Sequence, residues 1–107
     1  MPLPDLTHLQ FLVLASLMGS KRAGRELRAK LAEQGVRKTG PAFYQLMARM
    51  EDARLVKGWY EQKIVDGQII KQRWYEARAD GLRAYNATRE FYLSQVSVNA
   101  KGGLVGA

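Results

Sequence analysis

The sequence contains no cysteine and only one histidine, His8, among its 107 residues. The absence of cysteine excludes disulfide bonds, thiolate metal sites and cysteine nucleophiles. His8 has no second histidine with which to complete a metal site. Carboxylates are scattered without the paired spacing of acid–base catalysis, and there is no glycine-rich phosphate loop. We therefore expect a protein that is not an enzyme and that carries no metal or other cofactor.

Long hydrophobic runs are also absent. The most apolar stretch, residues 9–18 (LQFLVLASLM), is much shorter than the roughly 20 residues of a transmembrane helix. The segment before it carries Asp5 in place of the basic residues of a signal peptide. These features predict a cytoplasmic protein with no membrane partner.

Acidic residues are few: 10 Asp and Glu stand against 17 Lys and Arg, which gives a net charge of +7. Such an excess favours a polyanionic partner, above all nucleic acid, although it also accompanies an ordinary solvated surface. A chain of this length forms one small domain, whose modest core often depends on a second copy.

Hydrophobic spacing predicts two helices before residue 36. The first begins at residue 6 or 7 and ends at Gly19, and the second occupies residues 21–35, with Gly35 ending it. Ala23 and Gly24 offer small surfaces for close helix approach. Basic residues are concentrated in residues 21–38, and either a solvated face or phosphate contact explains Arg25, Arg28 and Lys30.

A third helix, predicted for residues 37–56, has a clear start signal and two unlike faces. Thr39 can cap the first turn, and Pro41 suits an early helical position. At about 100° per residue, one face collects the apolar side chains of Phe43, Leu46, Met47, Met50 and Ala53. The other face carries Tyr44, Gln45, Ala48, Arg49 and Asp52.

The polar face of this helix is the candidate surface for DNA reading, since its phenol, amide and guanidinium groups can meet phosphates and base edges. Two alternatives stay open. Tyr44 either contacts DNA or packs on the following hairpin, and Arg49 either contacts a phosphate or pairs with Asp52 or Glu51.

A β-hairpin is predicted for residues 56–65 and 68–77, because two runs rich in β-branched and aromatic residues flank Asp66-Gly67. Trp59 and Trp74 are expected to pack the base of the hairpin against the helices. Lys63, Gln68 and Lys71 lie nearer the tip, where a DNA-binding wing would contact the backbone.

A last helix is predicted from Ala79 to about residue 96, with apolar groups on two sides. So small a domain can cover only one side, which favours a homodimer. The candidate interface residues are Phe11, Leu82, Tyr85, Phe91 and Tyr92. We thus expect a DNA-binding domain over residues 1–78, a dimerisation helix over 79–97 and a flexible glycine-rich tail over 98–107.

The order of three helices, a hairpin and a helix is that of a winged helix, and the sequence resembles the PadR-like family of bacterial transcriptional regulators over roughly residues 9–92. Residues 43–51 (FYQLMARME) are similar to the family's Leu-Tyr-Pro-Leu-Leu-x-Arg-Leu-Glu signature, and residues 23–27 (AGREL) stand where it favours His-Gly-Tyr-Glu-Leu. Arg73-Trp74-Tyr75 and Ala79-Asp80-Gly81 are similar to its Arg-Lys-Tyr-Tyr strand and Thr-Glu-Ala-Gly helix start. Departures occur at Arg54, where a turn glycine is usual, and at Arg78, where a capping threonine is usual.

The resemblance implies a dimeric repressor whose third helix enters the major groove, whose wings touch the DNA backbone and whose last helix forms the dimer. Tyr44 and Arg49 carry over as DNA-contacting positions. The full candidate set is Arg25, Lys38, Thr39, Tyr44, Gln45, Arg49, Lys63 and Lys71. A small aromatic effector, common in the family, would lie near Phe11, Tyr85 and Tyr92, for which core packing is the alternative role.

The predicted fold class is therefore mainly α with a small β-hairpin (α+β), a winged helix-turn-helix with an added C-terminal dimerisation helix. The predicted function is sequence-specific binding of double-stranded DNA by a dimeric transcriptional repressor. The alternative is a winged-helix protein–protein interaction module whose basic surface only confers solubility.

Overall fold

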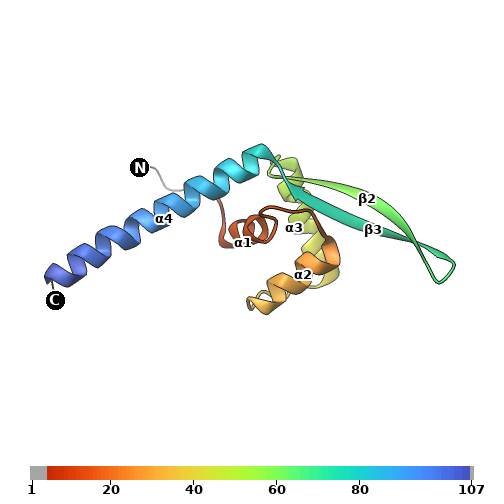
Figure 1. Ribbon diagram of the computed structural model, residues 1–107, viewed down its shortest axis with the longest axis horizontal. Helices are drawn as coiled ribbons and strands as arrows, with labels where there is room; N and C mark the ends of the chain where they lie inside the picture. The colour runs from red at the N-terminus through yellow and green to blue at the C-terminus, as the bar shows by residue number, and fades with distance from the viewer. Residues whose placement is uncertain (1–4, 107) are drawn as a thin grey trace.

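The computed structural model describes residues 5–106, with side chains as far as residue 97. Within that range lie four helices and three strands: α1 (His8–Ser16), β1 (Arg22–Ala23), α2 (Gly24–Glu33), α3 (Gly40–Asp52), β2 (Val56–Val65), β3 (Gln68–Ala77) and α4 (Ala79–Gly106). The first three helices cluster beside the base of the β2–β3 hairpin, while the hairpin and α4 project in opposite directions (Figure 1). The predicted winged-helix architecture is confirmed.

The first helix begins where it was predicted to begin, but it ends at Ser16, three residues before the predicted Gly19. Thr7 and Gln10 form a capping box, in which the Gln10 amide donates to the Thr7 hydroxyl at 3.1 Å and the Thr7 amide donates to the Gln10 side chain at 3.0 Å. Gly19 and Gly35, predicted to end α1 and α2, have φ angles of +82° and +86°, which a residue with a Cβ adopts only at a cost.

The start of the second helix was wrong in the sequence-based prediction. Residues 22 and 23, which were assigned to that helix, instead form β1, whose Arg22 pairs with Tyr75 and whose Ala23 pairs with Trp74. The sheet therefore has three strands in the order β1-β3-β2, not the two of a simple hairpin. Pairing with β1 covers an edge of β3 that would otherwise expose unpaired backbone groups.

Helix α3 is shorter than predicted. Its cap is the expected one, since the Thr39 hydroxyl accepts from the Ala42 amide at 3.3 Å. The helix ends at Asp52 because Arg54 adopts a left-handed conformation, with φ +60°. Ala53, predicted on the apolar face, is consequently exposed at the C-cap, and Val56 begins β2 in place of ending the helix.

The hairpin has the predicted strands and the predicted turn. Asp66 and Gly67 have φ angles of 52° and 78°, which match a type I′ turn. Trp59 pairs directly with Trp74, and Gly58 with Tyr75. Because side chains alternate across a strand, the tryptophans lie on the sheet face opposite the buried Tyr75. The prediction that they pack against the helices is therefore wrong: the Lys21 ammonium covers them, 4.8 Å from the Trp74 ring and 5.9 Å from the Trp59 ring.

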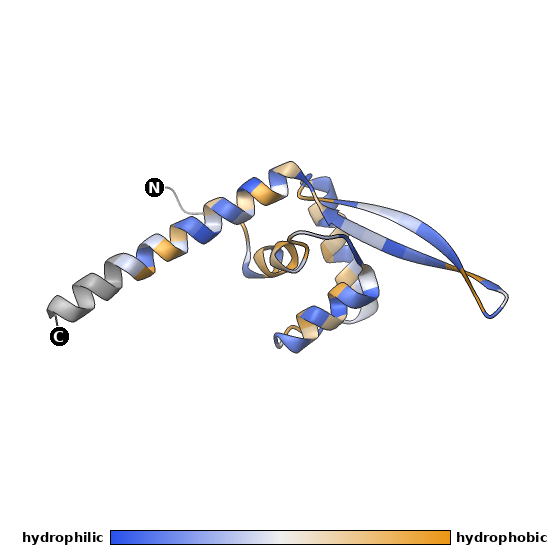
Figure 2. Ribbon diagram, in the orientation of Figure 1, coloured by the Kyte–Doolittle hydropathy of each residue, from blue (hydrophilic) through white to orange (hydrophobic). Residues whose placement is uncertain are grey.

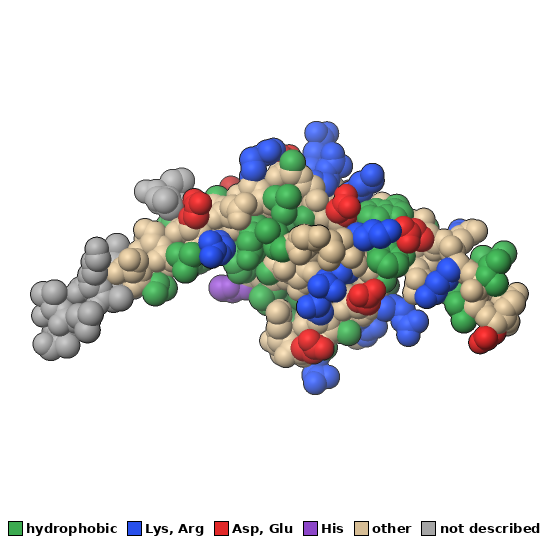
Figure 3. Space-filling model, in the orientation of Figure 1, with side chains coloured by type: hydrophobic (Ala, Val, Ile, Leu, Met, Phe, Trp, Pro, Cys, Tyr) green, Lys and Arg blue, Asp and Glu red, His purple; other side chains and the backbone are tan. Residues whose placement is uncertain are grey.

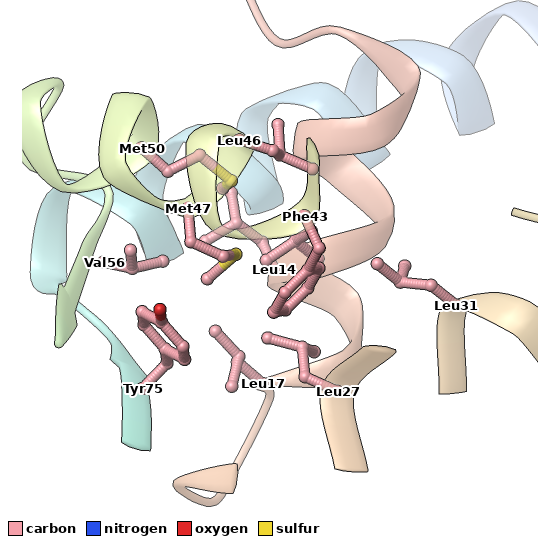
Figure 4. Packing of buried hydrophobic residues seen from close by; sticks show 11 residues of the cluster. Leu14, Leu17, Leu27, Leu31, Phe43, Leu46, Met47, Met50, Val56 and Tyr75 are labelled. Atoms are coloured by element: carbon pink, nitrogen blue, oxygen red, sulfur yellow. The ribbon is translucent and has the colours of Figure 1, made fainter. Parts of the chain in front are cut away.

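The core draws on the first three helices and the base of the hairpin (Figure 4). Its buried members are Val13, Leu14, Leu17, Leu27, Leu31, Phe43, Leu46, Met47, Met50, Val56 and Tyr75. Helix α1 is mostly apolar and packs between α2 and α4, as its colouring in Figure 2 reflects. The Phe43 and Tyr75 rings meet edge to face at 6.4 Å, joining α3 to the sheet.

The last helix extends to Gly106, beyond its predicted end near residue 96. Its first turn docks on the α3–β2 connection, where the Arg78 amide donates to the Leu55 carbonyl at 3.0 Å. The predicted flexibility of residues 98–107 stays a prediction, since their side chains lie outside the described residues. None of the helices in residues 5–106 combines the length and apolarity needed to cross a membrane.

Candidate nucleic-acid interface

Helix α3 presents the two faces that its sequence predicts. Phe43, Leu46, Met47 and Met50 are buried, whereas Tyr44, Gln45, Ala48 and Arg49 are exposed. The core residues hold the helix against α1, α2 and the sheet, so the exposed side chains project from a rigid element.

A basic hollow, here called the α2–α3 hollow, lies between α2, the α2–α3 turn and Tyr44. It has a volume of about 360 Å³, and its lining residues are Arg25, Arg28, Ala29, Ala32, Arg37, Lys38 and Tyr44. None of these described lining residues is acidic. The Arg28 Nε donates to the Lys38 carbonyl at 2.9 Å, so this guanidinium is held at the turn that joins the two helices.

The α2–α3 hollow contains more basic residues than the sequence-based set. Arg25 and Lys38 were predicted, and phosphate contact was one of two alternatives for Arg28, whereas Arg37 was missed. The only sequence signal for Arg37 is the density of Lys and Arg in residues 21–38. That density does not show that the turn brings Arg37 back beside α2.

Tyr44 lies against the start of α2. A Cβ on Gly24 would lie 2.9 Å from the Tyr44 hydroxyl oxygen, so glycine is what allows this approach. The ring also meets Phe43 edge to face at 5.0 Å, and 41% of the residue remains exposed. Tyr44 is thus positioned by α2 and the core while its outer side stays open to a ligand.

A smaller basic hollow, the hairpin hollow, continues from Tyr44 towards β3. Its volume is about 120 Å³, and it is lined by Ala23, Arg25, Tyr44, Ile70, Lys71, Gln72 and Arg73. The Lys71 ammonium lies 5.6 Å from the centre of the Tyr60 ring. Arg25 and Tyr44 border both hollows, so the basic surface is continuous from the α2–α3 turn to the hairpin.

Arg73 has a structural role at the floor of this surface. Its guanidinium donates to Glu51 at 2.6 Å and lies 4.8 Å from the centre of the Tyr60 ring. Burial lowers the pKa of Arg73. The hydrogen bond to Tyr75 and the charge of Glu51 together raise that pKa by more than burial lowers it, so the net shift is upward. Burial also raises the pKa of the Tyr75 phenol. The Glu51–Arg73 pair joins α3 to β3.

This pair also bears on the alternatives for Arg49. Glu51 is engaged by Arg73, and the expected pairing of Arg49 with Glu51 or Asp52 is not formed within the described part of the chain, while its contact with a phosphate stays a prediction. Arg49 is therefore a free cation in the last turn of α3. It borders neither hollow, and the same is true of Gln45.

Solved structures resemble this arrangement, although no protein-family model and no curated protein matches the chain. A PadR-family transcription regulator from Clostridium difficile has a TM-score of 0.73 and 17% identity, over 89% of this chain and 97% of that one. Another, from Eggerthella lenta, has a TM-score of 0.63 and 25% identity, over 91% of this chain and 80% of that one. The chain has the PadR-like winged-helix fold.

The same PadR-like fold occurs in a structure of Bacillus subtilis PadR in complex with operator DNA. That protein is 13% identical, with a TM-score of 0.61, and the match covers 76% of this chain and 46% of that one. The family resemblance seen in the sequence is thereby confirmed at the level of fold.

Two further predicted DNA-binding residues lie apart from the two hollows of this PadR-like chain. The Thr39 hydroxyl serves as the α3 cap, although it remains exposed. Lys63 pairs with Ile70, and the next pair along the hairpin is Gln62 with Lys71. Lys63 and Lys71 therefore lie on opposite faces of the hairpin. The structure thus gathers Arg25, Lys38, Tyr44 and Lys71, and leaves Thr39, Gln45, Arg49 and Lys63 outside.

The predicted dimer residues differ in how far their own chain covers them. Phe11 stacks on Tyr85 with ring centroids 4.8 Å apart, and Leu82 borders a small hollow with Leu17. Phe91 is half-buried and meets Tyr92 edge to face at 5.2 Å. Tyr92 is 51% exposed. The predicted set omitted two other exposed apolar residues of α4, Leu93 and Val96.

These α4 side chains border an apolar groove, here called the α1–α4 groove. It has a volume of about 380 Å³ and is lined by Leu6, Thr7, His8, Phe11, Thr88, Arg89, Tyr92, Leu93 and Val96. Thr88 is buried within it and donates from its hydroxyl to the Ala84 carbonyl at 2.7 Å. The groove is open to a further apolar surface.

Proposed function

We propose that this PadR-like protein is a DNA-binding transcriptional regulator that inserts α3 into the major groove. The observation that carries the proposal is the continuous basic surface around Tyr44, formed by the α2–α3 hollow and the hairpin hollow. Its cations repel one another, and a polyanion would relieve that repulsion. The structure of Bacillus subtilis PadR, which has a similar fold, contains operator DNA.

Nearby carboxylates do not neutralise this surface. Glu51 is paired with Arg73, and Glu61 is paired with Lys21 at 2.8 Å on the other side of the sheet. In the proposed complex the hollows hold phosphates, through Arg25, Arg28, Arg37, Lys38 and Lys71. The exposed Tyr44, Gln45 and Arg49 of α3 then face the base edges and the groove wall, and Thr39 and Lys63 add contacts to the backbone.

We further infer that a second copy covers the α1–α4 groove. Three apolar residues of this groove are exposed to water: Tyr92, Leu93 and Val96. Burying them against the same groove of a twofold partner would be favourable, because it removes apolar surface from water. Two α3 helices about 34 Å apart would then reach successive major grooves. Such a cytoplasmic dimer would repress by occupying its operator, and a small aromatic effector near Phe11 and Tyr92 would act by altering the dimer.

A salt-dependent binding titration tests the proposal. The duplex is first selected from random DNA by the wild-type protein, and its dissociation constant is then measured between about 50 and 200 mM salt. Each phosphate contact adds about 0.9 to the slope of log affinity against log salt. Arg37→Ala is expected to lower that slope by about one.

Arg83→Ala is the matched control, since it removes the same charge from an exposed position on α4, where Arg83 pairs with Asp80. Its slope should equal that of the wild type. Failure of the wild-type protein to select any duplex, or binding without a salt slope, would contradict the proposal and favour the protein-interaction alternative.

A further inference from the structure

The α2–α3 hollow is larger than a single DNA phosphate requires. Its volume of about 360 Å³ lies within the range of small-molecule sites, roughly 300–1,000 Å³. The backbone of a duplex is convex, so in the proposed complex it would contact the rim of the hollow without filling the space behind. A ligand that fills this volume must therefore be smaller than a duplex and larger than a phosphate.

Positive charge surrounds the hollow. Arg25 and Arg28 lie three residues apart on α2, so they share one face of that helix. Arg37 and Lys38 come from the α2–α3 turn. On the face of the molecule shown in Figure 3, Lys and Arg side chains are interspersed with Asp and Glu, whereas none of the described residues that line the hollow is acidic. Such a hollow favours a ligand with several negative charges close together.

A polyphosphate concentrates its charge more than the backbone of DNA does. Successive phosphates of a polyphosphate share a bridging oxygen, whereas successive phosphates of DNA are separated by a sugar. Arg28 is prepared for such a group, because its Nε donates to the Lys38 carbonyl at 2.9 Å and its Nη groups are left outside that bond. A guanidinium that is already held in place loses less conformational freedom when it binds phosphate.

Tyr44 adds an aromatic surface to the hollow. Gly24 and Phe43 hold its ring in place, and 41% of the residue stays exposed. Ala29 and Ala32 also line the hollow, and their short side chains occupy little of its volume. A nucleobase stacked on an aromatic side chain contributes about 1–3 kcal/mol. An aromatic ring beside clustered cations thus suits a ligand that has both a base and a polyphosphate.

We propose that the α2–α3 hollow binds a nucleoside polyphosphate, with its base on Tyr44 and its phosphates on the surrounding arginines and lysine. The proposed function places DNA phosphates on the same cations, so bound nucleotide and bound DNA exclude each other. This exclusion rests on the proposed DNA-binding function, whereas the nucleotide site itself does not. The protein would then release its operator as the nucleotide concentration rises.

Isothermal titration calorimetry without DNA tests the site directly. The ligands are ATP and GTP, together with methyl triphosphate, which has the same charge but no base, and adenosine, which has no phosphate. ATP and GTP are expected to bind about 5- to 150-fold more tightly than methyl triphosphate, because only they stack on Tyr44. Adenosine alone should show no measurable binding.

Two variants assign the contacts, each with a matched control. Tyr44→Leu should lower the affinity for ATP by about 5- to 150-fold and leave that for methyl triphosphate unchanged. Its control is Tyr60→Leu, because Tyr60 is 62% exposed and does not line the hollow. Arg37→Ala should weaken both ligands about tenfold, and Arg83→Ala on α4 should weaken neither. Thermal unfolding without ligand checks that the variants stay folded.

Competition on the selected duplex tests the exclusion. ATP should displace the duplex from the wild type with an inhibition constant equal to its calorimetric dissociation constant, because the two ligands share one set of cations. Sodium sulfate at equal ionic strength is the control for screening. In Tyr44→Leu, the ATP concentration needed for displacement should rise by the same factor as the dissociation constant of ATP.

Three results would overturn the inference: a wild type that binds the duplex but neither ATP nor GTP, equal ATP binding by the wild type and Tyr44→Leu, or simultaneous binding of ATP and the duplex. None of them contradicts DNA binding, which the Arg37→Ala salt slope tests separately. If the wild type binds ATP as expected but binds no duplex, the nucleotide site is supported and the proposed function fails.

Discussion

Replacing Gly81 by alanine should destabilise the protein, although helix propensity predicts the opposite. Gly81 lies in the first turn of α4, where alanine is ordinarily better than glycine by up to about 1 kcal/mol. Gly81 is buried, however, and a Cβ there would overlap the Leu55 carbonyl oxygen and lie 3.0 Å from Leu14 Cδ2. The contact of α4 with the α3–β2 connection thus leaves no room for a methyl group.

The size of the effect follows from what would have to move. Overpacking a well-filled site costs about 1–3 kcal/mol. The overlapped atom is a backbone oxygen that accepts from the Arg78 amide at 3.0 Å, so displacing it also weakens a hydrogen bond worth about 1 kcal/mol. After subtracting the propensity gain, we expect a net loss of about 1–3 kcal/mol, or a fall in Tm of about 5–20 °C.

Urea and thermal unfolding followed by circular dichroism, at one protein concentration, would measure this loss. Gly40→Ala is the matched control, because the nearest atom to its Cβ is Arg28 Nη1 at 3.7 Å, an ordinary contact. The control should change stability by no more than about 1 kcal/mol in either direction, because the helix propensity gained with alanine is opposed by Pro41, which disfavours a helical conformation in the residue before it. If Gly81→Ala were as stable as Gly40→Ala, the docking of α4 described above would be refuted.

Three further predictions concern other parts of the molecule. Arg54→Gly should raise the free energy of unfolding by up to about 1 kcal/mol in urea titrations, because Arg54 has a φ of +60°, and unchanged or lower stability would count against strain there. Leu27→Ala should lower the free energy of unfolding by about 2–5 kcal/mol, because Leu27 is fully buried. A loss below about 1 kcal/mol would mean that the surrounding side chains relax to fill the cavity. Hydrogen bonds from Lys21 and Trp59 lower the pKa of Glu61 below its ordinary 4.5. The ionised Glu61 therefore stabilises the folded state fully above pH 4.5, and this stabilisation is lost as the pH falls through the lowered pKa. Tryptophan fluorescence should change in that acidic range in the wild type, and the same change in Glu61→Gln would assign it to another group.

Short-range signals were sufficient for most elements of the fold. The Thr39 cap, the glycine signals at Gly19 and Gly35, and the Asp66-Gly67 turn all act within a few residues of chain, so they can be read without knowing the fold. The burial of one face of α3 followed from its periodicity for the same reason.

The errors arose where distant segments meet. Residues 22 and 23 belong to a run rich in good helix formers, yet they pair with β3 because the sheet edge is close by in space. Trp59 and Trp74 were expected against the helices, but the strand register turns them to the other face, under Lys21. Neither outcome is encoded in the neighbouring residues.

The sequence by itself thus determined the order of helices and hairpin, the two faces of α3 and the basic character of its surroundings, because each depends on local propensity, spacing or composition. Only the tertiary structure decided that Arg37 joins Arg25 around one hollow and that Gly24 makes room for Tyr44. These relations depend on how separate elements pack, and packing is a property of the whole chain.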